Sequence, residues 1–140
     1  MKLSVIIPVY NEEMTVGELI DRVARVDVGD IEMEIIVTND GSTDSSVLIN
    51  EEYCKKYPAL VQAYSMPINL GKGAAVRLGL HHATGDLILV QDADLELDPN
   101  EYTYLLKPIV DGKTDVVYGS RFMNKKRHSI PLRTRLANSF

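Results

Sequence analysis

The 140-residue sequence predicts an α/β fold, with helices flanking a mostly parallel sheet. Short apolar runs of strand length alternate with longer segments whose apolar residues recur every three or four positions. Turn-forming and helix-capping residues separate the two kinds of segment. The length suits one domain with its own hydrophobic core. Strands are expected at residues 5–10, 35–38, 61–65, 87–90 and 116–118, and helices at 16–23, 47–57, 74–83 and 99–109.

Composition and charge exclude several classes of protein. The single cysteine, Cys54, cannot form an internal disulfide, which fits a reducing compartment. No apolar run approaches the length of a membrane-spanning helix, and no interleaving of aromatic and basic residues indicates nucleic-acid binding. The formal net charge of -5 is uneven, because residues 121–140 carry six Lys and Arg and no acid. This basic segment predicts an anionic partner, and a solvated basic loop is the alternative.

The stretch around Asp92 and Asp94 is the first candidate site. The four apolar residues at 87–90 predict a central strand that is buried on both faces. If the chain stays extended after this strand, Asp92 and Asp94 point to the same side. Two such carboxylates repel each other unless a cation or a proton lies between them, and their oxygens suit Mg²⁺ or Mn²⁺. A strand-end turn with solvated acids explains the stretch alone equally well.

Polar clusters after other strands favour the cation site. They occur at residues 10–12, 39–40, 92–94 and 120–121, each directly after an expected strand. Because the carboxyl ends of parallel strands meet at one edge of the sheet, these clusters are expected to lie close together. That edge is where α/β proteins bind their ligands.

Six short motifs occur in a fixed order along the chain. They are Val-Ile-Ile-Pro-Val-Tyr-Asn-Glu (5–12), Asn-Asp-Gly-Ser-Thr-Asp (39–44), Asn-Leu-Gly-Lys-Gly-Ala (69–74), Ala-Thr-Gly-Asp (83–86), Asp-Ala-Asp-Leu-Glu-Leu-Asp-Pro (92–99) and Gly-Ser-Arg (119–121). In order and spacing they resemble family 2 glycosyltransferases, which have the GT-A fold, a Rossmann-like and mostly parallel sheet flanked by helices. Within that family the chain is most similar to polyprenyl-phosphate sugar transferases of the dolichyl-phosphate mannosyltransferase kind.

The resemblance implies roles for the residues that bind the sugar donor. The donor would be a nucleoside-diphosphate sugar, with Asp40 on its base and Glu96 near its sugar. Asp92 and Asp94 would hold Mg²⁺ or Mn²⁺ on the diphosphate, with Asp94 as the direct ligand. The glycine loop around Lys72 is expected to be structural, with Lys72 as a candidate contact. The implied donor-binding residues are Pro8, Tyr10, Glu12, Asp40, Asp92, Asp94 and Glu96.

The resemblance also implies an acceptor side. Arg121 would face the acceptor phosphate, assisted by Arg133 or Arg135, because a guanidinium binds phosphate in a bidentate manner. Asp92, Asp94 and Arg121 are therefore the expected catalytic residues. The chain departs from the family at Asn39, where relatives usually carry an acid. The amide keeps the size and hydrogen-bonding capacity of the acid but removes a charge.

The expected reaction is inverting transfer of a sugar from a UDP- or GDP-sugar to a polyprenyl or dolichyl phosphate. Three alternatives stay open: the same fold acting on a saccharide hydroxyl, a nucleotide-binding domain without catalysis, and a phosphoryl-transfer or receiver-type domain with Asp92 as phosphate acceptor. The first requires a carboxylate base, which we expect beyond Phe140. The last fits poorly, because it calls for a lone Asp nucleophile and a lysine after a later strand.

The expected organisation is a nucleotide-sugar-binding core at residues 1–120, followed at 121–140 by the basic start of an acceptor-binding region. An apolar stripe at Leu132, Leu136 and Phe140 suggests a helix that the chain end interrupts, so the sequence is expected to be part of a longer protein. The basic segment could also meet anionic lipid headgroups, which predicts a location at the cytoplasmic face of a membrane. Homo-oligomerisation is left open.

Overall fold

The computed structural model describes residues 1–119. The chain divides into two compact units, Met1–Thr103 and Tyr104–Phe140, and the candidate site belongs to the first. The predictions for Ser120, Arg121, Arg133 and Arg135, and for the stripe ending at Phe140, lie outside the described residues. The predicted boundary between residues 120 and 121 stays a prediction.

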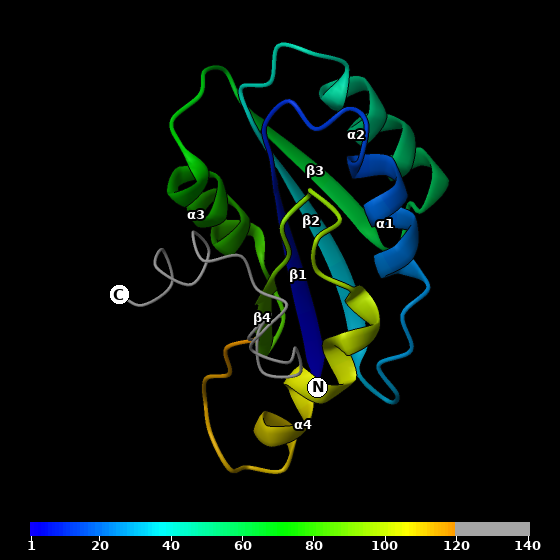
Figure 1. Ribbon diagram of the computed structural model, residues 1–140, viewed down its shortest axis with the longest axis vertical. Helices are drawn as coiled ribbons and strands as arrows, with labels where there is room; N and C mark the ends of the chain where they lie inside the picture. Colours follow the sequence, from blue (N-terminus) through cyan, green and yellow to red (C-terminus); the bar gives the residue numbers. More distant parts are fainter. Residues whose placement is uncertain (120–140) are drawn as a thin grey trace, which may run out of the picture. The chain divides into compact units, whose positions relative to one another are not determined.

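The first unit is built on a parallel sheet in the order β3-β2-β1-β4 (Figure 1). The strands are β1 (Lys2–Val9), β2 (Glu32–Asp40), β3 (Val61–Met66) and β4 (Leu87–Val90), and all three strand pairs are parallel. The helices are α1 (Val16–Ala24), α2 (Ser46–Lys56), α3 (Lys72–His82), the short 3₁₀ helix η1 (Pro99–Glu101) and α4 (Tyr102–Val110), which begins in the first unit. The predicted α/β class is confirmed.

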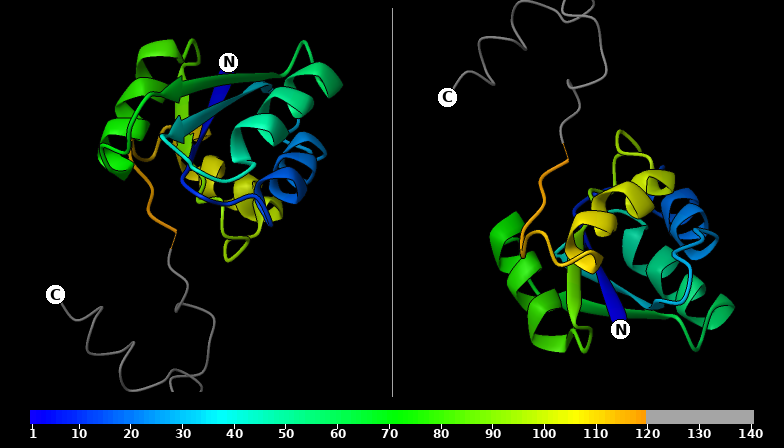
Figure 2. Two further views of the ribbon diagram at one scale, coloured as in Figure 1. Left: turned by 90° about the horizontal axis from the view of Figure 1, so that it is seen from above. Right: turned by 90° about the horizontal axis from the view of Figure 1, so that it is seen from below.

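The helices cover both faces of the sheet. Helices α1 and α2 pack on one face and α3 on the other (Figure 2). The chain moves from β1 to β2 to β3 in one direction, and α3 then carries it back across the sheet to β4 on the far side of β1. The direction of winding therefore reverses between β1 and β4. In open α/β sheets this reversal opens a crevice at the carboxyl ends of the two strands.

The core lies around β1 and β2. Val5, Ile6 and Ile7 of β1 are fully buried, as are Ile35 and Ile36 of β2. These neighbouring residues point to opposite faces, so both faces of the two strands are covered. Gly79 lets α3 approach β1 closely, because a Cβ there would lie 2.4 Å from Cγ2 of Ile6.

The prediction for β4 is wrong in one respect. Among the described residues it is an edge strand that pairs only with β1, and Ile88 and Val90 are 44% and 42% exposed. The apolar run was read as a central strand, whereas β1 and β2 occupy the centre. Strand order depends on long-range pairing, which an apolar run does not record.

The strand expected at residues 116–118 is not formed within the described part of the chain. Thr114 explains this locally, because its hydroxyl donates to the Val116 carbonyl (3.0 Å) and accepts from the Val116 N–H (3.3 Å). Such side-chain bonds compete with ladder pairing. Val116 and Tyr118 are 60% and 90% exposed.

A buried acid fastens the amino ends of the strands, opposite the candidate site. Glu34 on β2 is 4% exposed and accepts from the Lys2 ammonium (2.8 Å), the Ser4 hydroxyl (2.6 Å), and the Thr84 N–H (2.7 Å) and hydroxyl (2.9 Å). Burial raises the pKa of the Glu34 carboxyl, but the hydrogen bonds from Lys2, Ser4 and Thr84 outweigh it and lower the pKa to about 2. The network joins β1, β2 and the segment that leads into β4.

Candidate active site

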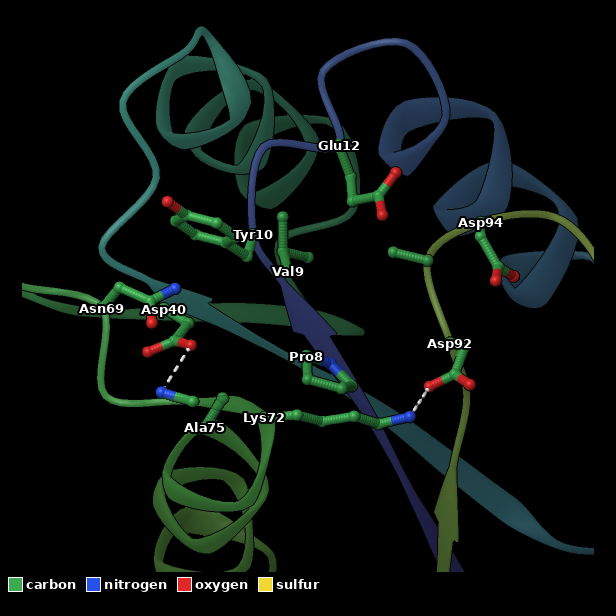
Figure 3. A pocket seen from close by; sticks show the side chains of 12 residues that line it. Pro8, Val9, Tyr10, Glu12, Asp40, Asn69, Lys72, Ala75, Asp92 and Asp94 are labelled. Carbon is green, nitrogen blue, oxygen red and sulfur yellow. Dashed lines mark hydrogen bonds and ion pairs between the residues drawn. The ribbon is translucent and has the colours of Figure 1, made fainter. Parts of the chain in front are cut away.

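A cavity of about 380 Å³ opens at the carboxyl edge of the sheet, where the winding reverses between β1 and β4. Its lining comes from the ends of β1, β2 and β4 and from the start of α3 (Figure 3). Six of the seven predicted donor-binding residues, including both predicted metal ligands, therefore share one cavity. Its lining residues are Pro8, Val9, Tyr10, Glu12, Asp40, Asn69, Gly71, Lys72, Ala75, Asp92, Ala93 and Asp94.

The loop after β1 is locked to the loop after β2. Asn11 has a left-handed backbone (φ 51°), which Asn tolerates better than most residues. Its Oδ1 accepts from the Thr43 N–H (2.8 Å), and its own N–H donates to the Ser42 hydroxyl (3.0 Å). Asn11 thereby holds Tyr10 and Glu12 at the cavity. The sequence placed Asn11 in a strand-end cluster, but the identity of its partners follows only from the fold.

Asp44 strengthens the same junction from the second loop. Its carboxylate accepts from the Ser46 N–H (2.9 Å) and the Glu13 N–H (3.2 Å). Burial raises the pKa of this carboxyl, but the hydrogen bonds from Ser46 and Glu13 prevail and lower it below its ordinary value. These contacts make Asp44 a residue that fixes the turn before α2.

Asp40 holds the glycine loop that leads into α3. It is 3% exposed, and its carboxylate oxygens accept from the backbone N–H groups of Leu70 (2.8 Å) and Gly71 (2.9 Å). Gly41 makes this approach possible, because its φ is +66° and a Cβ would lie 2.3 Å from the carbonyl carbon of Ile68. Asp40 thus positions the loop that carries Lys72, in addition to facing the cavity.

Asn39 is a structural residue in this chain. It is 2% exposed. Its Oδ1 accepts a hydrogen bond from the Ser42 N–H (3.2 Å), and its Nδ2 donates to the Ser65 hydroxyl (3.4 Å). The amide therefore ties the end of β2 to both the following loop and β3. Asn39, where the family usually has an acid, therefore has hydrogen-bond partners and places no charge in the interior.

The acid pair does not have the geometry predicted from the sequence. Strand β4 ends at Val90, and Ala93 and Asp94 form a turn. Figure 3 shows the Asp92 carboxylate directed toward Lys72, whereas the Asp94 carboxylate is not directed toward Lys72. The extended alternation that would align them is therefore absent. The turn is stabilised by the Glu96 N–H, which donates to Oδ1 of Asp94 (3.1 Å), and Leu95 has a φ of 62°.

Lys72 is paired with Asp92. Its ammonium donates to Oδ1 of Asp92, with 60% of the Lys72 side chain and 40% of the Asp92 side chain exposed. The pair bridges the start of α3 and the segment that follows β4, so a positive group already faces Asp92. The sequence suggested Lys72 only as a candidate contact, because this partner is distant along the chain.

The donor set fits a divalent cation that shares its ligands with a bound phosphate. Asp92 and Asp94 offer carboxylate oxygens at one cavity, and Asp92 is paired with the Lys72 ammonium. In the described part of the chain no group of three or more His, Cys, Asp or Glu residues is arranged to hold a metal ion. Mg²⁺ and Mn²⁺ at such sites use few protein carboxylates, and phosphates and waters complete the shell.

The remaining predicted residues divide between the cavity and elsewhere. Glu12 lines the cavity and accepts from the Thr15 hydroxyl through Oε2 (3.1 Å), while Tyr10 is 47% exposed there. Glu96 lies in the turn after Asp94 and is not among the lining residues. The predicted acceptor residues Arg121, Arg133 and Arg135 lie outside the described residues. No described helix is long and apolar enough to cross a membrane.

Comparison with known proteins identifies the family of this α/β chain. Residues 4–135 match Glycosyl transferase family 2. The chain belongs to this family, and its fold is GT-A, as the motifs predicted.

Among curated relatives, the chain is 35% identical to a dolichyl-phosphate beta-glucosyltransferase of Trichomonas vaginalis, over 94% of this chain and 43% of the relative. It is 37% identical to the dolichol-phosphate mannosyltransferase of Pyrococcus furiosus, over 88% and 34%. It is 31% identical to the dodecaprenyl-phosphate galacturonate synthase of Rhizobium johnstonii, over 86% and 36%. The chain thus spans less than half the length of each of these relatives.

Two solved structures show the same fold with ligands bound. A mannosyltransferase from Pyrobaculum calidifontis, in complex with GDP-Man and Mn²⁺, aligns with a TM-score of 0.65 at 26% identity, over 76% of this chain and 32% of that chain. TarS residues 1–349 of S. aureus, in complex with UDP-GlcNAc, aligns with a TM-score of 0.64 at 30% identity, over 80% and 32%.

Proposed function

We propose that this chain carries the donor site of a metal-dependent, inverting glycosyltransferase that moves a sugar from a UDP- or GDP-sugar to a polyprenyl phosphate. The observation that carries the proposal is the gathering of Asp40, Asp92, Asp94 and Lys72 around one cavity at the winding reversal. The curated relatives support the acceptor class, since their names describe sugar transfer to dolichyl, dolichol or dodecaprenyl phosphates. The two ligand-bound neighbours support a nucleoside-diphosphate sugar as donor.

In this proposal the nucleoside lies along Pro8, Tyr10 and Glu12. The exposed ring of Tyr10 offers an apolar surface, and Asp40 at the floor of the cavity offers acceptor oxygens to the base. Each Asp40 oxygen keeps acceptor capacity beyond its bond to the glycine loop, because a carboxylate oxygen has two lone pairs. Base binding and loop positioning are therefore compatible in one side chain.

The diphosphate lies between the start of α3 and the turn after β4. Asp92 and Asp94 would hold Mg²⁺ or Mn²⁺ there, and the bound cation would stabilise the negative charge that develops on the leaving diphosphate. With a cation on Asp92, the Lys72 ammonium would be free to contact a phosphate oxygen. Glu96 lies two residues after Asp94 in the same turn, and we assign it to the sugar end of the donor.

The acceptor supplies its own nucleophile. A phosphate oxygen is already ionised at neutral pH, so the acceptor needs to be positioned more than deprotonated. We assign this task to Arg121, with Arg133 or Arg135 assisting, and we take attack to be in line with inversion at the sugar carbon. A polyprenyl acceptor lies in a bilayer, so we place the reaction at a membrane surface, and we propose the cytoplasmic face as its location.

The test is a panel of UDP- and GDP-sugars incubated with the full-length protein and radiolabelled polyprenyl phosphate. We expect one donor to give a lipid-linked sugar product that requires Mg²⁺ or Mn²⁺ and disappears in Asp94→Ala. Transfer to a saccharide hydroxyl but not to polyprenyl phosphate would contradict the acceptor assignment. Nucleotide binding without transfer to any acceptor would support a binding domain without catalysis.

A further inference from the structure

The turn that carries Asp92 and Asp94 rests on a buried polar pair that is outside the cavity. Gln91 and Tyr102 are each 2% exposed, and the Tyr102 hydroxyl donates to Oε1 of Gln91 (2.8 Å). Neither residue lines the cavity. Buried polar side chains are costly unless their partners are fixed, so a pair of this kind requires a defined local structure.

The Gln91 amide bridges the two ends of this turn, residues 92–97, which we call the acid loop. Its Nε2 donates to the carbonyl of Asp92 at the start of the loop (3.0 Å) and lies 3.4 Å from the carbonyl of Leu97 at its end. The Gln91 N–H also donates to the Ile6 carbonyl on β1 (2.9 Å). One side chain therefore closes the base of the loop, and its backbone ties that base to the centre of the sheet.

Tyr102 fixes which way the Gln91 amide points. Burial raises the pKa of the Tyr102 hydroxyl above its ordinary value, so the hydroxyl stays protonated and donates. A donating hydroxyl needs an acceptor, and in the Gln91 amide only the oxygen can accept. The amide nitrogen is therefore left facing the carbonyls of Asp92 and Leu97. Tyr102 is itself held at the first residue of α4, after η1, whose start is capped by Asp98 (Asn100 N–H to Oδ1, 3.0 Å).

We propose that Tyr102 and Gln91 form a lock that positions the acid loop and thereby sets the affinity of Asp92 and Asp94 for the divalent cation. This inference rests on the proposed function for the cation itself. Partners that orient metal ligands from behind typically contribute about 10–100-fold to metal affinity. Gln91 and Tyr102 are positioning residues, because neither faces the cavity.

The test compares Tyr102→Phe, which keeps the buried ring and removes the hydroxyl, with Gln91→Met, which keeps the length of the side chain and removes all its hydrogen bonds. Tyr104→Phe is the matched control, since Tyr104 is 80% exposed. Mn²⁺ affinity is measured by electron paramagnetic resonance in the presence of UDP or GDP. Backbone hydrogen exchange of residues 92–97, followed by mass spectrometry, is measured without metal or nucleotide.

We expect both lock variants to weaken Mn²⁺ binding by about tenfold or more and to speed exchange in the acid loop, with the control unchanged. Adding Mn²⁺ and nucleotide should restore part of the protection in the lock variants. Faster exchange with unchanged Mn²⁺ affinity would overturn the proposal, because the lock would then be purely structural. Unchanged exchange would overturn it as well.

The design separates failure of this inference from failure of the proposed function. If the wild-type protein binds Mn²⁺ with nucleotide and Asp94→Ala does not, the cation site stands, and only the lock variants decide the inference. If the wild-type protein binds no Mn²⁺ with either nucleotide, the proposed function fails and the inference fails with it. A lock variant that does not fold is identified by circular dichroism, and the other variant then decides.

Discussion

Protonation of Glu34 should remove a large part of the stability of the domain. The pKa of this carboxyl falls from an ordinary value of 4.5 to about 2, because three neighbouring residues donate to the buried carboxylate. A folded-state pKa below the unfolded one means that the charged form stabilises the fold. The contribution is complete above about pH 4.5 and is lost as the pH falls through about 2. A difference of about 2.5 in pKa corresponds to about 3 kcal/mol.

The assay is urea unfolding followed by circular dichroism between pH 7 and pH 2, for the wild-type protein and Glu34→Gln. The variant imitates the protonated carboxyl, so it should be about 3 kcal/mol less stable at pH 7. Other carboxylates titrate in both proteins, so their contributions cancel in the difference. The difference should therefore shrink as the pH falls from about 4.5 to about 2.

Glu32→Gln is the control for this experiment, because Glu32 is an exposed carboxylate on the same strand. It should change the unfolding free energy by less than about 0.5 kcal/mol at pH 7. Parallel stability profiles for the wild-type protein and Glu34→Gln, with a constant difference across the whole range, would refute the assignment of the acid-sensitive stability to Glu34.

Two further substitutions test the cavity wall and its cation. Gly41→Ala should lower the unfolding free energy by about 2–4 kcal/mol and weaken nucleotide binding in calorimetry, because its Cβ would meet the Ile68 backbone at 2.3 Å. Gly29→Ala, at φ +67° with nothing within 4 Å, isolates the backbone strain and should cost only about 1 kcal/mol; equal losses would contradict the close approach. Lys72→Met should raise Mn²⁺ affinity without nucleotide about twofold and weaken UDP or GDP binding, since it frees Asp92 but removes a phosphate contact. A fall in Mn²⁺ affinity would argue against competition between Lys72 and the cation for Asp92. The control is Lys55→Met, because Lys55 is an exposed lysine on another helix, α2.

The sequence predicted the location of the site well, because that location follows from local signals. Each polar cluster after a strand could be placed on the sheet edge once the alternation of strands and helices was seen. Asp40, Asp92 and Asp94 were found in this way, and the structure brings them to one cavity. The resemblance to the family added the expected ligand, which local spacing alone does not define.

What the sequence missed depends on contacts between distant residues. The Lys72 pair with Asp92, the amide partners of Asn39 and the buried bond between Tyr102 and Gln91 all join segments that are separate along the chain. Nothing in the sequence indicates this role for Tyr102, because an aromatic residue in a helix gives no sign of a hydroxyl partner. The turn at Asp94 was missed because a short polar segment can leave a strand in several conformations.

The strand order was beyond the sequence for a related reason. The apolar residues at 87–90 satisfy the pattern of a buried strand, yet β4 lies at the edge of the described sheet. Edge and centre differ only in whether a second partner is present, and partner choice is a property of the whole chain. At residues 116–118 composition favours a strand, whereas the Thr114 hydroxyl bonds to both backbone groups of Val116.

The central claim is that the cavity at the reversal of winding holds a nucleoside diphosphate through a cation on Asp92 and Asp94. Isothermal titration calorimetry of UDP and GDP, with and without Mn²⁺, tests it most directly. The claim predicts binding of one nucleotide that depends on Mn²⁺ and is lost in Asp94→Ala but kept in Asp30→Ala, which changes an exposed acid away from the cavity. Binding of equal strength without metal, or undiminished binding in Asp94→Ala, would contradict it.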